Sequence, residues 1–379
     1  MGELARLFFK LGAISFGGPA AHLALIEDEV VARRKWLTHE QFLDLLGATN
    51  LIPGPNSLEM AAHIGYRRAG TPGLLVAAAA FTLPAAVLTA ALAWAYLRFG
   101  ALPEVGPFLA GIKPAVVAVI AVAMIRLGTK ALATWPLAMI GLAAAGASLA
   151  GINEVLALFA GGFLGSLVLA RWKTKAAAAA VLGSITATAH AAPLAAGVAA
   201  GTVASGASLG AIALFFLRVG ATLYGTGYVL IAYLERGLVH RHGWLGQEQL
   251  IDAVAAGQIT PGPLISTATF VGYLLAGAGG AAVATLAIIL PGLLLVGLTN
   301  PLIPRLRRWA WTARFLDAIN AASIGLIALV SLRMAAASAT SITAILIAVV
   351  SAIVLLRWKV SPIWLVLGGA AIGGLTGAI

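Results

Sequence analysis

NLIPGPNS, residues 50–57, places a Pro-Gly-Pro triplet inside an otherwise apolar segment. Proline removes a backbone donor and clashes with the preceding helical turn, and glycine loosens the backbone, so the triplet predicts a break in a helix. The same triplet recurs in QITPGPLIS, residues 258–266. A chain that interrupts two apolar segments in the same way needs a common reason for both breaks.

The composition is that of a membrane protein. Of the 379 residues, 61% are hydrophobic and only 10% are charged, and the mean hydropathy is +1.00. Soluble domains carry about 25% charged residues, and apolar runs of about 17 or more residues can cross a hydrocarbon core about 30 Å thick. We therefore predict an all-α polytopic membrane protein. No cleavable signal peptide is expected, because no small-residue cleavage site follows a short apolar core at MGELARLFFK.

Several functional classes are disfavoured by the residue content. The chain has no cysteine, which excludes disulfides, thiolate metal sites and a cysteine nucleophile. It also lacks the H-E-x-x-H and G-x-S-x-G patterns of common hydrolases, so we predict neither an enzyme nor a cofactor or metal. The net charge of +11 would suggest nucleic-acid binding in a soluble protein. Here most Lys and Arg residues flank apolar runs, so membrane orientation explains them and no nucleic-acid partner is expected.

The chain is an internal duplication. A shift of 208 positions aligns residues 10–55 with residues 218–263 without a gap, and 16 of these 46 positions are identical. After the loss of one residue, a shift of 207 continues the match and pairs Pro84 with Pro291. We predict a first repeat, an Ala/Gly-rich connector or extra span, and a second repeat, with boundaries at residues 1–172, 173–209 and 210–379.

Charge placement predicts that the two copies are inverted relative to each other. If the Pro-Gly-Pro segments are re-entrant and residues 176–204 cross the membrane once, sixteen basic residues fall on one face and four on the other. The positive-inside rule expects such an asymmetry. A parallel repeat, with the Ala-rich stretch as a loop, is the alternative.

The broken segments predict an anion site. In transporters, half-helices begin near the membrane midplane and turn their N-terminal amides toward an anionic substrate. Proline suits the first position of such a helix, and Ser or Asn can cap it. Proline kinks used only for packing are the alternative. We predict that four breaks, two from each copy, converge on a small oxyanion through Ser15, Gly17, Gly18, Pro19, His22, Asn50, Pro53, Gly54, Pro55, Asn56, Ser57, Tyr224, Gly225, Thr226, Gln258, Pro261, Gly262 and Pro263.

Four further binding residues are predicted from charge and repeat position. An ionisable side chain at membrane depth costs about 2.5–3.5 kcal/mol, which favours a functional role. Lys10 and Arg218 occupy equivalent positions just before the glycine-rich breaks, and Lys113, equivalent to Asn320, is the most isolated charge of the chain. Snorkelling to the headgroups, or an interfacial helix start for Lys113, is the alternative interpretation.

Two side chains near the breaks are predicted to exchange protons. Glu59 follows PGPNSL, and its equivalent in the second copy is Thr267. A carboxylate there repels a dianion unless it is protonated, and His22 has a pKa suited to neutral pH. A repeated W-L-x-x-E-Q-x-x-D pattern also carries two pairs of acids, Glu40 with Asp44 and Glu248 with Asp252. For this pattern we predict a structural role, with gating as the alternative.

These motifs closely resemble one known family. FFKLGAISFGGPAAHL, RRKWLTHEQFLDLL, NLIPGPNS and FTLPAAVL are similar to the chromate transporter (CHR) family, and the second half resembles that family's C-terminal domain. The resemblance implies chromate efflux across the bacterial inner membrane, driven by the proton motive force, with sulfate as a chemical look-alike. It also implies two homologous domains in opposite orientations.

An alternative function and two further features complete the predictions from sequence. A carrier or channel for sulfate or another small anion is the alternative function. GGP of the first copy is GTG in the second, so the two half-sites are not equivalent. Glycine-rich helices near the C-terminus permit the close helix contacts of a homodimer.

Overall fold

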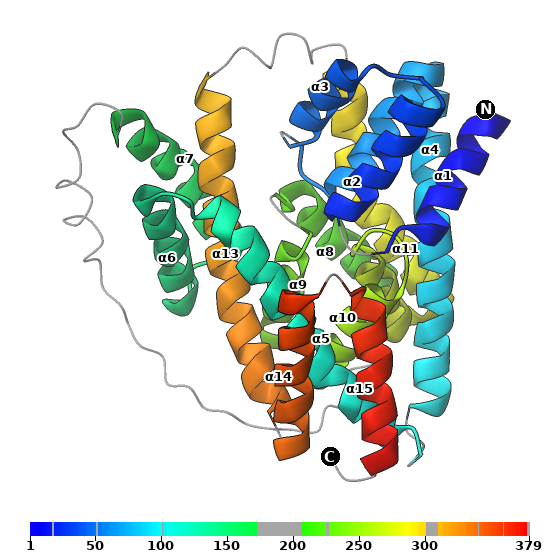
Figure 1. Ribbon diagram of the computed structural model, residues 1–379, viewed down its shortest axis with the longest axis vertical. Coiled ribbons are helices and arrows are strands. Elements are labelled where there is room, and N and C mark those ends of the chain that lie inside the picture. Colours follow the sequence, from blue (N-terminus) through cyan, green and yellow to red (C-terminus); the bar gives the residue numbers. More distant parts are fainter. Residues whose placement is uncertain are drawn as a thin grey trace.

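The described part of the chain is helical and contains no strand (Figure 1). The computed structural model describes residues 1–16, 19–50, 52–100, 102, 104–172, 207–224, 227–300, 310–339, 341–358 and 360–376. Most of the predicted connector therefore lies outside the described residues. The helices of the first copy are α1 (Gly2–Ile14), α2 (Pro19–Glu27), the π-helical segment η1 (Asp28–Arg33), α3 (His39–Thr49), α4 (Asn56–Phe99), α5 (Gly106–Ala131), α6 (Trp135–Leu149) and α7 (Glu154–Trp172). Those of the second copy are α8 (Leu209–Thr222), α9 (Val229–Leu234), the π-helical segment η2 (Glu235–Arg241), α10 (Gln247–Ile259), α11 (Ser266–Thr299), α13 (Ala310–Ser338), α14 (Ile342–Arg357) and α15 (Pro362–Thr376).

Four of the described helices are long and apolar enough to cross a membrane, namely α4, α5, α11 and α13. Many of their outward-facing side chains are large and apolar, which suits contact with lipid. On α4, for example, Leu83, Val87 and Trp94 are each more than half exposed. The prediction of an all-α, multi-pass membrane protein is confirmed.

Helices α4 and α11 are each folded back near their first third. The backbone leaves helical geometry at Ala69 and Gly70, where Gly70 has a φ of +61°. In a continuous helix residues eight apart lie about 12 Å from each other, yet a Cβ on Gly73 would overlap the carbonyl oxygen of Gly65. The same turn recurs in α11 at Ala276 and Gly277. Each of the two therefore consists of a short helix that follows Pro-Gly-Pro and a long helix that crosses the membrane.

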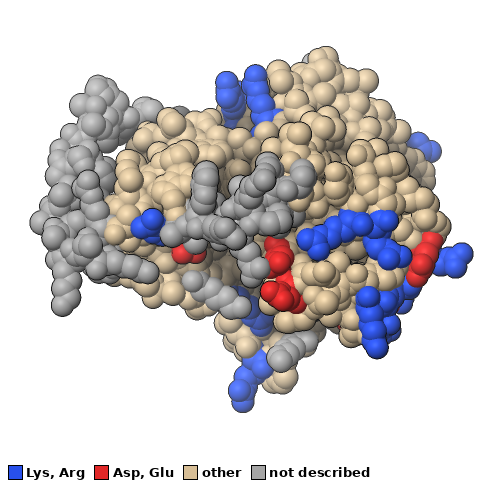
Figure 2. Space-filling model, turned by 90° about the horizontal axis from the view of Figure 1, so that it is seen from above, with Lys and Arg blue, Asp and Glu red and all other residues tan. Residues whose placement is uncertain are grey.

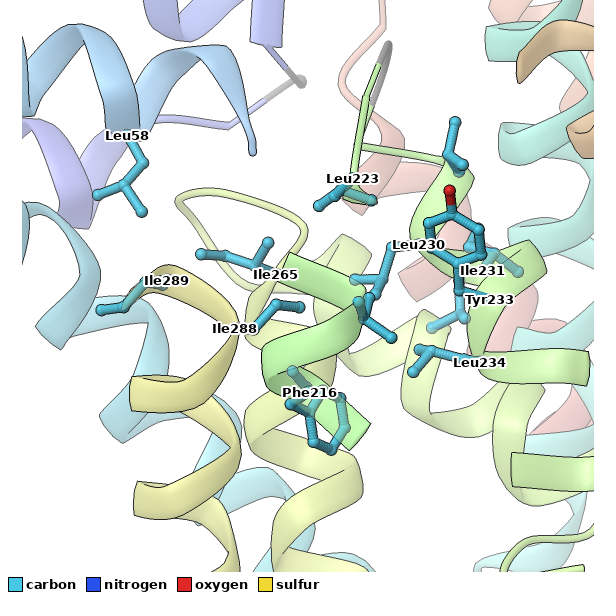
Figure 3. Close-up of a cluster of buried hydrophobic side chains, with 14 of the residues drawn as sticks. Leu58, Phe216, Leu223, Leu230, Ile231, Tyr233, Leu234, Ile265, Ile288 and Ile289 are labelled. Carbon is cyan, nitrogen blue, oxygen red and sulfur yellow. The ribbon is translucent and has the colours of Figure 1, made fainter. Parts of the chain in front are cut away.

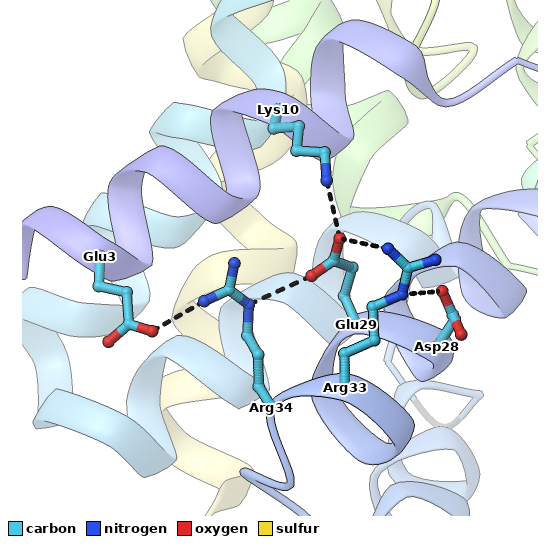
Figure 4. Close-up of polar contacts among 6 residues, drawn as sticks. All are labelled: Glu3, Lys10, Asp28, Glu29, Arg33 and Arg34. Atoms are coloured by element: carbon cyan, nitrogen blue, oxygen red, sulfur yellow. Dashed lines mark hydrogen bonds and ion pairs between the residues drawn. The ribbon is translucent and has the colours of Figure 1, made fainter.

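The first break is also part of a re-entrant hairpin. Helix α1 ends at Ile14, and α2 and η1 return alongside it. Two ion pairs join the outgoing and returning arms, Lys10 Nζ to Glu29 Oε1 and Arg34 to Glu3, each at 2.8 Å (Figure 4). Both ends of the hairpin therefore lie on the same side.

Reciprocal contacts relate the two copies. The amide of Gly54 donates to the carbonyl of Leu223, and the amide of Gly262 donates to the carbonyl of Ser15, each at 2.7 Å. Under the 208-residue shift Gly54 is equivalent to Gly262 and Ser15 is equivalent to Leu223, so the two hydrogen bonds are equivalent as well. The repeat-related helices α5 and α13 run in opposite directions along the vertical axis of Figure 1, as their colour order shows. The copies are thus inverted, and the parallel arrangement is not the one adopted.

The long helices also exchange partners between copies. Helix α5 packs against α14 and α15 of the second copy, whereas α13 packs against α6 and α7 of the first. Glycine allows these close approaches: a Cβ on Gly369 of α15 would overlap the carbonyl of Gly111 of α5. The C-terminal glycines that we expected to permit a homodimer contact are in part used inside the chain. Helix association in lipid rests on such packing, because burial from lipid adds little hydrophobic gain.

The hydrophobic core lies where the two copies meet. Figure 3 shows Leu58 of α4 facing Ile265, Ile288 and Ile289, with Phe216 of α8 below them. Leu58 and Phe216 are fully buried. The core therefore fixes α4 against α11 and α8 directly beneath the breaks.

Basic side chains predominate on one face of the molecule (Figure 2). Figure 2 shows the face at the top of Figure 1, where Lys and Arg side chains are more prominent than Asp and Glu. Residues 173–206 and 301–309, which carry several of the basic residues counted above, lie outside the described residues. The sixteen-to-four asymmetry stays a prediction.

Candidate anion site

A small cavity lies where the four breaks meet. Its volume is about 40 Å³, and because a water needs roughly 10–15 Å³ by this measure, it has room for a few waters or one small polyatomic ion. Both copies contribute to its lining, which consists of Ser15, Phe16, His22, Pro55, Ser57, Gly227, Tyr228, Gly257, Gln258, Thr260, Gly262, Pro263, Leu264, Ser361 and Pro362.

The cavity is lined by polar atoms that lack partners. Within the described part of the chain, the side-chain atoms Ser15 Oγ, His22 Nε2, Gln258 Nε2 and Ser361 Oγ are buried and have no partner in good hydrogen-bond geometry. The Gln258 side chain is near the Tyr228 hydroxyl and the His22 ring is near the Ser15 backbone. The other ring nitrogen of His22, Nδ1, lies 3.3 Å from Ser57 Oγ. If Ser57 donates to Nδ1, Nε2 carries the proton and is a donor toward the cavity. Leaving a buried polar group unsatisfied costs about 1–3 kcal/mol, so four of them around one cavity indicate a ligand that accepts hydrogen bonds.

The electrostatics of the cavity come from dipoles. Among the described lining residues there is no Lys, Arg, Asp or Glu. Helices α4 and α11 both begin at the Pro-Gly-Pro turns that border the cavity, and a helix N-terminus carries a positive partial charge. The arrangement therefore suits a small anion held by neutral donors.

Comparison with known proteins agrees with this geometry. The Chromate transporter family model matches residues 2–166 and again residues 210–374. The chain belongs to the chromate transporter family. A chromate transport protein of Cupriavidus metallidurans is 32% identical over 98% of this chain and 92% of its own length. A probable chromate transport protein of Synechococcus elongatus is 32% identical over 86% of this chain and 82% of its own. A chromate transport protein of Pseudomonas aeruginosa is 30% identical over 88% and 80%. No solved structure matches the chain significantly.

Members of this family are transporters rather than enzymes, as the sequence predicts. The two matched regions correspond to the two copies, so the duplication is confirmed.

The structure brings many of the predicted residues of this transporter to the cavity. Seven line it, namely Ser15, His22, Pro55, Ser57, Gln258, Gly262 and Pro263. Others belong to the same turns without lining the cavity, namely Asn50, Pro53, Gly54, Asn56, Tyr224 and Pro261. Asn56 donates to Asn50 Oδ1 at 2.7 Å and so closes the first Pro-Gly-Pro turn. Gly17, Gly18, Gly225 and Thr226 lie outside the described residues, as does the side chain of Pro19.

The predicted cations do not line the cavity. Lys10 is paired with Glu29 on the neighbouring arm of its hairpin. Lys113 is paired with Glu248 of α10 at 2.9 Å. Arg218 is exposed, and Asn320, the repeat equivalent of Lys113, is half-buried on α13.

Several lining residues are not among the predicted binding residues, namely Phe16, Gly227, Tyr228, Gly257, Thr260, Leu264, Ser361 and Pro362. Ser361 and Pro362 form the start of α15, and their partners in the cavity lie about a hundred or more residues away in the sequence. A Ser-Pro pair that opens an apolar helix is the same signal that we used at the other breaks, and it could have drawn attention to this position.

The carboxyl group of Glu59 lies next to the cavity but outside its lining. Glu59 is 1% exposed, and its Oε2 makes no hydrogen bond to any described residue. A Cβ on Gly54 would overlap Glu59 Oε1, and a Cβ on Gly292 of α11 would lie 2.7 Å from the same atom. The carboxyl group is therefore enclosed between the Pro-Gly-Pro turn and α11.

The corresponding place in the other copy holds a methyl group. A shift of 207 pairs Gly292 with Ala85 of α4. The Cβ of Ala85 would lie 2.9 Å from a Cβ on Gly262, which is the equivalent of Gly54. One Pro-Gly-Pro turn thus packs against a carboxyl group and the other against a methyl group, so the inverted halves are chemically different.

Proposed function

We propose that the chain exports chromate across the bacterial inner membrane, driven by the proton motive force, and that the cavity between the four breaks binds the anion. The observation that carries this proposal is the set of four buried polar atoms around the cavity that have no partner in good hydrogen-bond geometry among the described residues, namely Ser15 Oγ, His22 Nε2, Gln258 Nε2 and Ser361 Oγ. Family membership supports transport, and relatives that are similar over most of their length are named chromate transport proteins.

A tetrahedral dianion suits both the donors around the cavity and the direction of the membrane potential. A tetrahedral oxyanion presents acceptor oxygens in all directions, which suits hydroxyl, amide and imidazole donors placed around a cavity of about 40 Å³. Export of a dianion moves two negative charges outward, and the membrane potential contributes about 2.3 kcal/mol per charge per 100 mV. Sulfate has the same shape and charge, so we propose that it shares the site.

Glu59 and His22 are the proposed proton-exchanging groups. Burying an ionised carboxylate without a partner costs several kcal/mol, and within the described part of the chain Glu59 Oε2 accepts no hydrogen bond. An ionised Glu59 one turn from the cavity repels a dianion, whereas a protonated Glu59 does not. The proton occupancy of Glu59 therefore sets the affinity of the neighbouring cavity for the anion.

The proposed organisation follows the repeats. We place the domain boundaries at residues 1–172, 173–209 and 210–379, and the family matches at residues 2–166 and 210–374 support them. The inner membrane is the proposed location, because export from the cytoplasm requires it.

Uptake into proteoliposomes tests this function. Labelled chromate and sulfate would be offered to the purified, reconstituted protein with and without an imposed pH gradient. We expect gradient-driven accumulation of both anions and its loss in Gln258→Leu, which removes one cavity donor. Thr376→Val is the matched control, because Thr376 is exposed and hydrogen-bonded only within its own helix. Anion movement that ignores the gradient would instead identify a channel, and full transport by Gln258→Leu would show that the cavity is not the site.

A further inference from the structure

A second cluster of ionisable side chains lies at the interface of the two copies, away from the cavity. Asp252 of α10 is 6% exposed. Its Oδ2 accepts a hydrogen bond from the hydroxyl of Tyr96 of α4 at 2.9 Å and lies 4.0 Å from Lys113 Nζ of α5. The same Nζ donates to Glu248 Oε2 at 2.9 Å. We call Asp252, Glu248, Lys113 and Tyr96 the Asp252 cluster.

We propose that the Asp252 cluster is a second proton-binding site of the transporter, with Asp252 as the group that takes up and releases the proton. The assignment rests first on charge. Lys113 is one cation shared by two carboxylates, so the cluster has a net charge of −1 when both are ionised and is neutral when it holds one proton. The uncompensated charge would lie on the buried Asp252, where it is costly, and this cost favours uptake of that proton.

The geometry assigns the proton to Asp252 rather than to Glu248. The side chain of Glu248 is 81% exposed, whereas that of Asp252 is 5% exposed. Lys113 Nζ lies 2.9 Å from Glu248 Oε2 but 4.0 Å from Asp252 Oδ2. The lysine charge therefore stabilises ionised Glu248 more than ionised Asp252. Asp252 Oδ1 is buried and makes no hydrogen bond in the described part of the chain, which leaves a free position for a proton.

Among the described residues, no other charged side chain forms an ion pair with Asp252. The other described charged or titratable side chains of the neighbouring helices α4 and α5, none of which is joined to Asp252, are Glu59, His63, Tyr66, Arg67, Arg68, Arg98 and Arg126. Of the remaining elements that pack against α10, α11 contributes only Tyr273 as an ionisable side chain, and α15 contributes none. Helix α13 and η2 carry charged residues, but among the described residues no ion pair joins them to Asp252. These charged residues are Glu235, Arg236, His240, Arg241, Arg314, Asp317 and Arg333.

Helix α10 connects the cluster to the anion cavity. Its last turn carries Gly257 and Gln258, and Thr260 and Gly262 follow, all of which line the cavity. Asp252 lies six residues before Gln258, a rise of about 9 Å along the helix axis. The exposed Glu248, the buried Asp252 and the cavity thus follow one another along one helix, which is the order that a proton from the surface would meet.

The cluster belongs to one copy only. A shift of 208 pairs Asp252 with Asp44, and a shift of 207 pairs Lys113 with Asn320. The acids are therefore present twice, but the half-buried lysine is present once. A purely structural role for the acidic pattern would not need this difference, whereas a single proton site in an inverted pair does.

Infrared spectroscopy of the purified protein tests the proton directly, without relying on transport. In a Glu59→Gln background, we expect a protonated-carboxyl band that disappears as the pH rises. Asp252→Asn should abolish it, while Asp44→Asn, the matched control, should keep it. Lys113→Met should shift its disappearance to higher pH, because the cation that favours the ionised carboxylate is gone. An unchanged band in Asp252→Asn would overturn the proposal.

Transport then separates this inference from the proposed function on which it rests. Asparagine keeps the shape of Asp252 and an acceptor for Tyr96, so we expect Asp252→Asn to exchange internal for external chromate normally but to lose accumulation driven by a pH gradient. Gradient-driven accumulation that is intact in Asp252→Asn would refute the second proton site and leave the proposed function standing. A parent protein that does not respond to the gradient would refute proton-driven export itself, whatever the infrared result.

Discussion

Substitution of Gly292 by alanine tests the role of Glu59 without altering the carboxyl group. The added Cβ would lie 2.7 Å from Glu59 Oε1 and 3.0 Å from the carbonyl oxygen of Pro53. Both distances are shorter than ordinary carbon–oxygen contacts, and overpacking of this kind costs about 1–3 kcal/mol. The Glu59 side chain is the part that can move, so its carboxyl group is displaced from beneath the Pro-Gly-Pro turn. If the whole cost falls on the transport step, gradient-driven chromate uptake slows by about 5- to 150-fold.

The assay is the initial rate of gradient-driven uptake in proteoliposomes, with two companion variants. Gly297→Ala is the matched control on the same helix, because its added Cβ would meet only Leu74 at 3.9 Å, and it should transport like the parent. Glu59→Asp withdraws the carboxyl group by one methylene, so adding it to Gly292→Ala should restore part of the rate. A parent-like rate in Gly292→Ala, or an equal loss in Gly297→Ala, would refute the reasoning.

Three further predictions concern the fold and the cavity. Gly73→Ala should lower the unfolding temperature of the purified protein, because its Cβ would overlap the carbonyl of Gly65 at the sharp turn of α4; an unchanged temperature would mean that the turn is absent. Glu29→Gln should destabilise by about 1.5–3 kcal/mol, the worth of a charged hydrogen bond, in a denaturant titration near neutral pH. The hydrogen bond from Lys10 lowers the pKa of Glu29 below its ordinary 4.5. The stabilisation by Glu29 should therefore be complete above pH 4.5 and be lost as the pH falls through the lowered pKa. A loss of this stabilisation on raising the pH would contradict the reasoning. Ser361→Ala should weaken chromate binding measured by equilibrium dialysis while leaving the unfolding temperature unchanged, and unaltered binding would remove α15 from the site.

The broken helices could be predicted because their cause is local. Proline and glycine at residues 53–55 and 261–263 interrupt a helix wherever they occur, and the duplication shows that both breaks belong to the same repeated unit. Because inverted copies approach the midplane from opposite sides, the inversion also predicted that the four breaks converge. His22 and Gln258 could be placed near the cavity for the same reason.

The partners of the charged residues could not be predicted, because they depend on contacts between distant segments. Lys113 meets Glu248 across 135 positions of sequence, and nothing in the residues around either one indicates the other. Lys10 was expected near the substrate, but the hairpin returns Glu29 to its side. The exchange of α5 and α13 between copies likewise depends on packing, and it is this exchange that brings Ser361 near the first copy.

The position of bound chromate is the most direct test of the account. Chromium gives an anomalous X-ray signal, so crystals of the protein soaked in chromate would show where the anion lies. The account predicts a peak in the cavity, within hydrogen-bond distance of Ser15 Oγ, His22 Nε2 and Gln258 Nε2. A peak beside Lys113, Arg218 or Arg236, with none in the cavity, would contradict it.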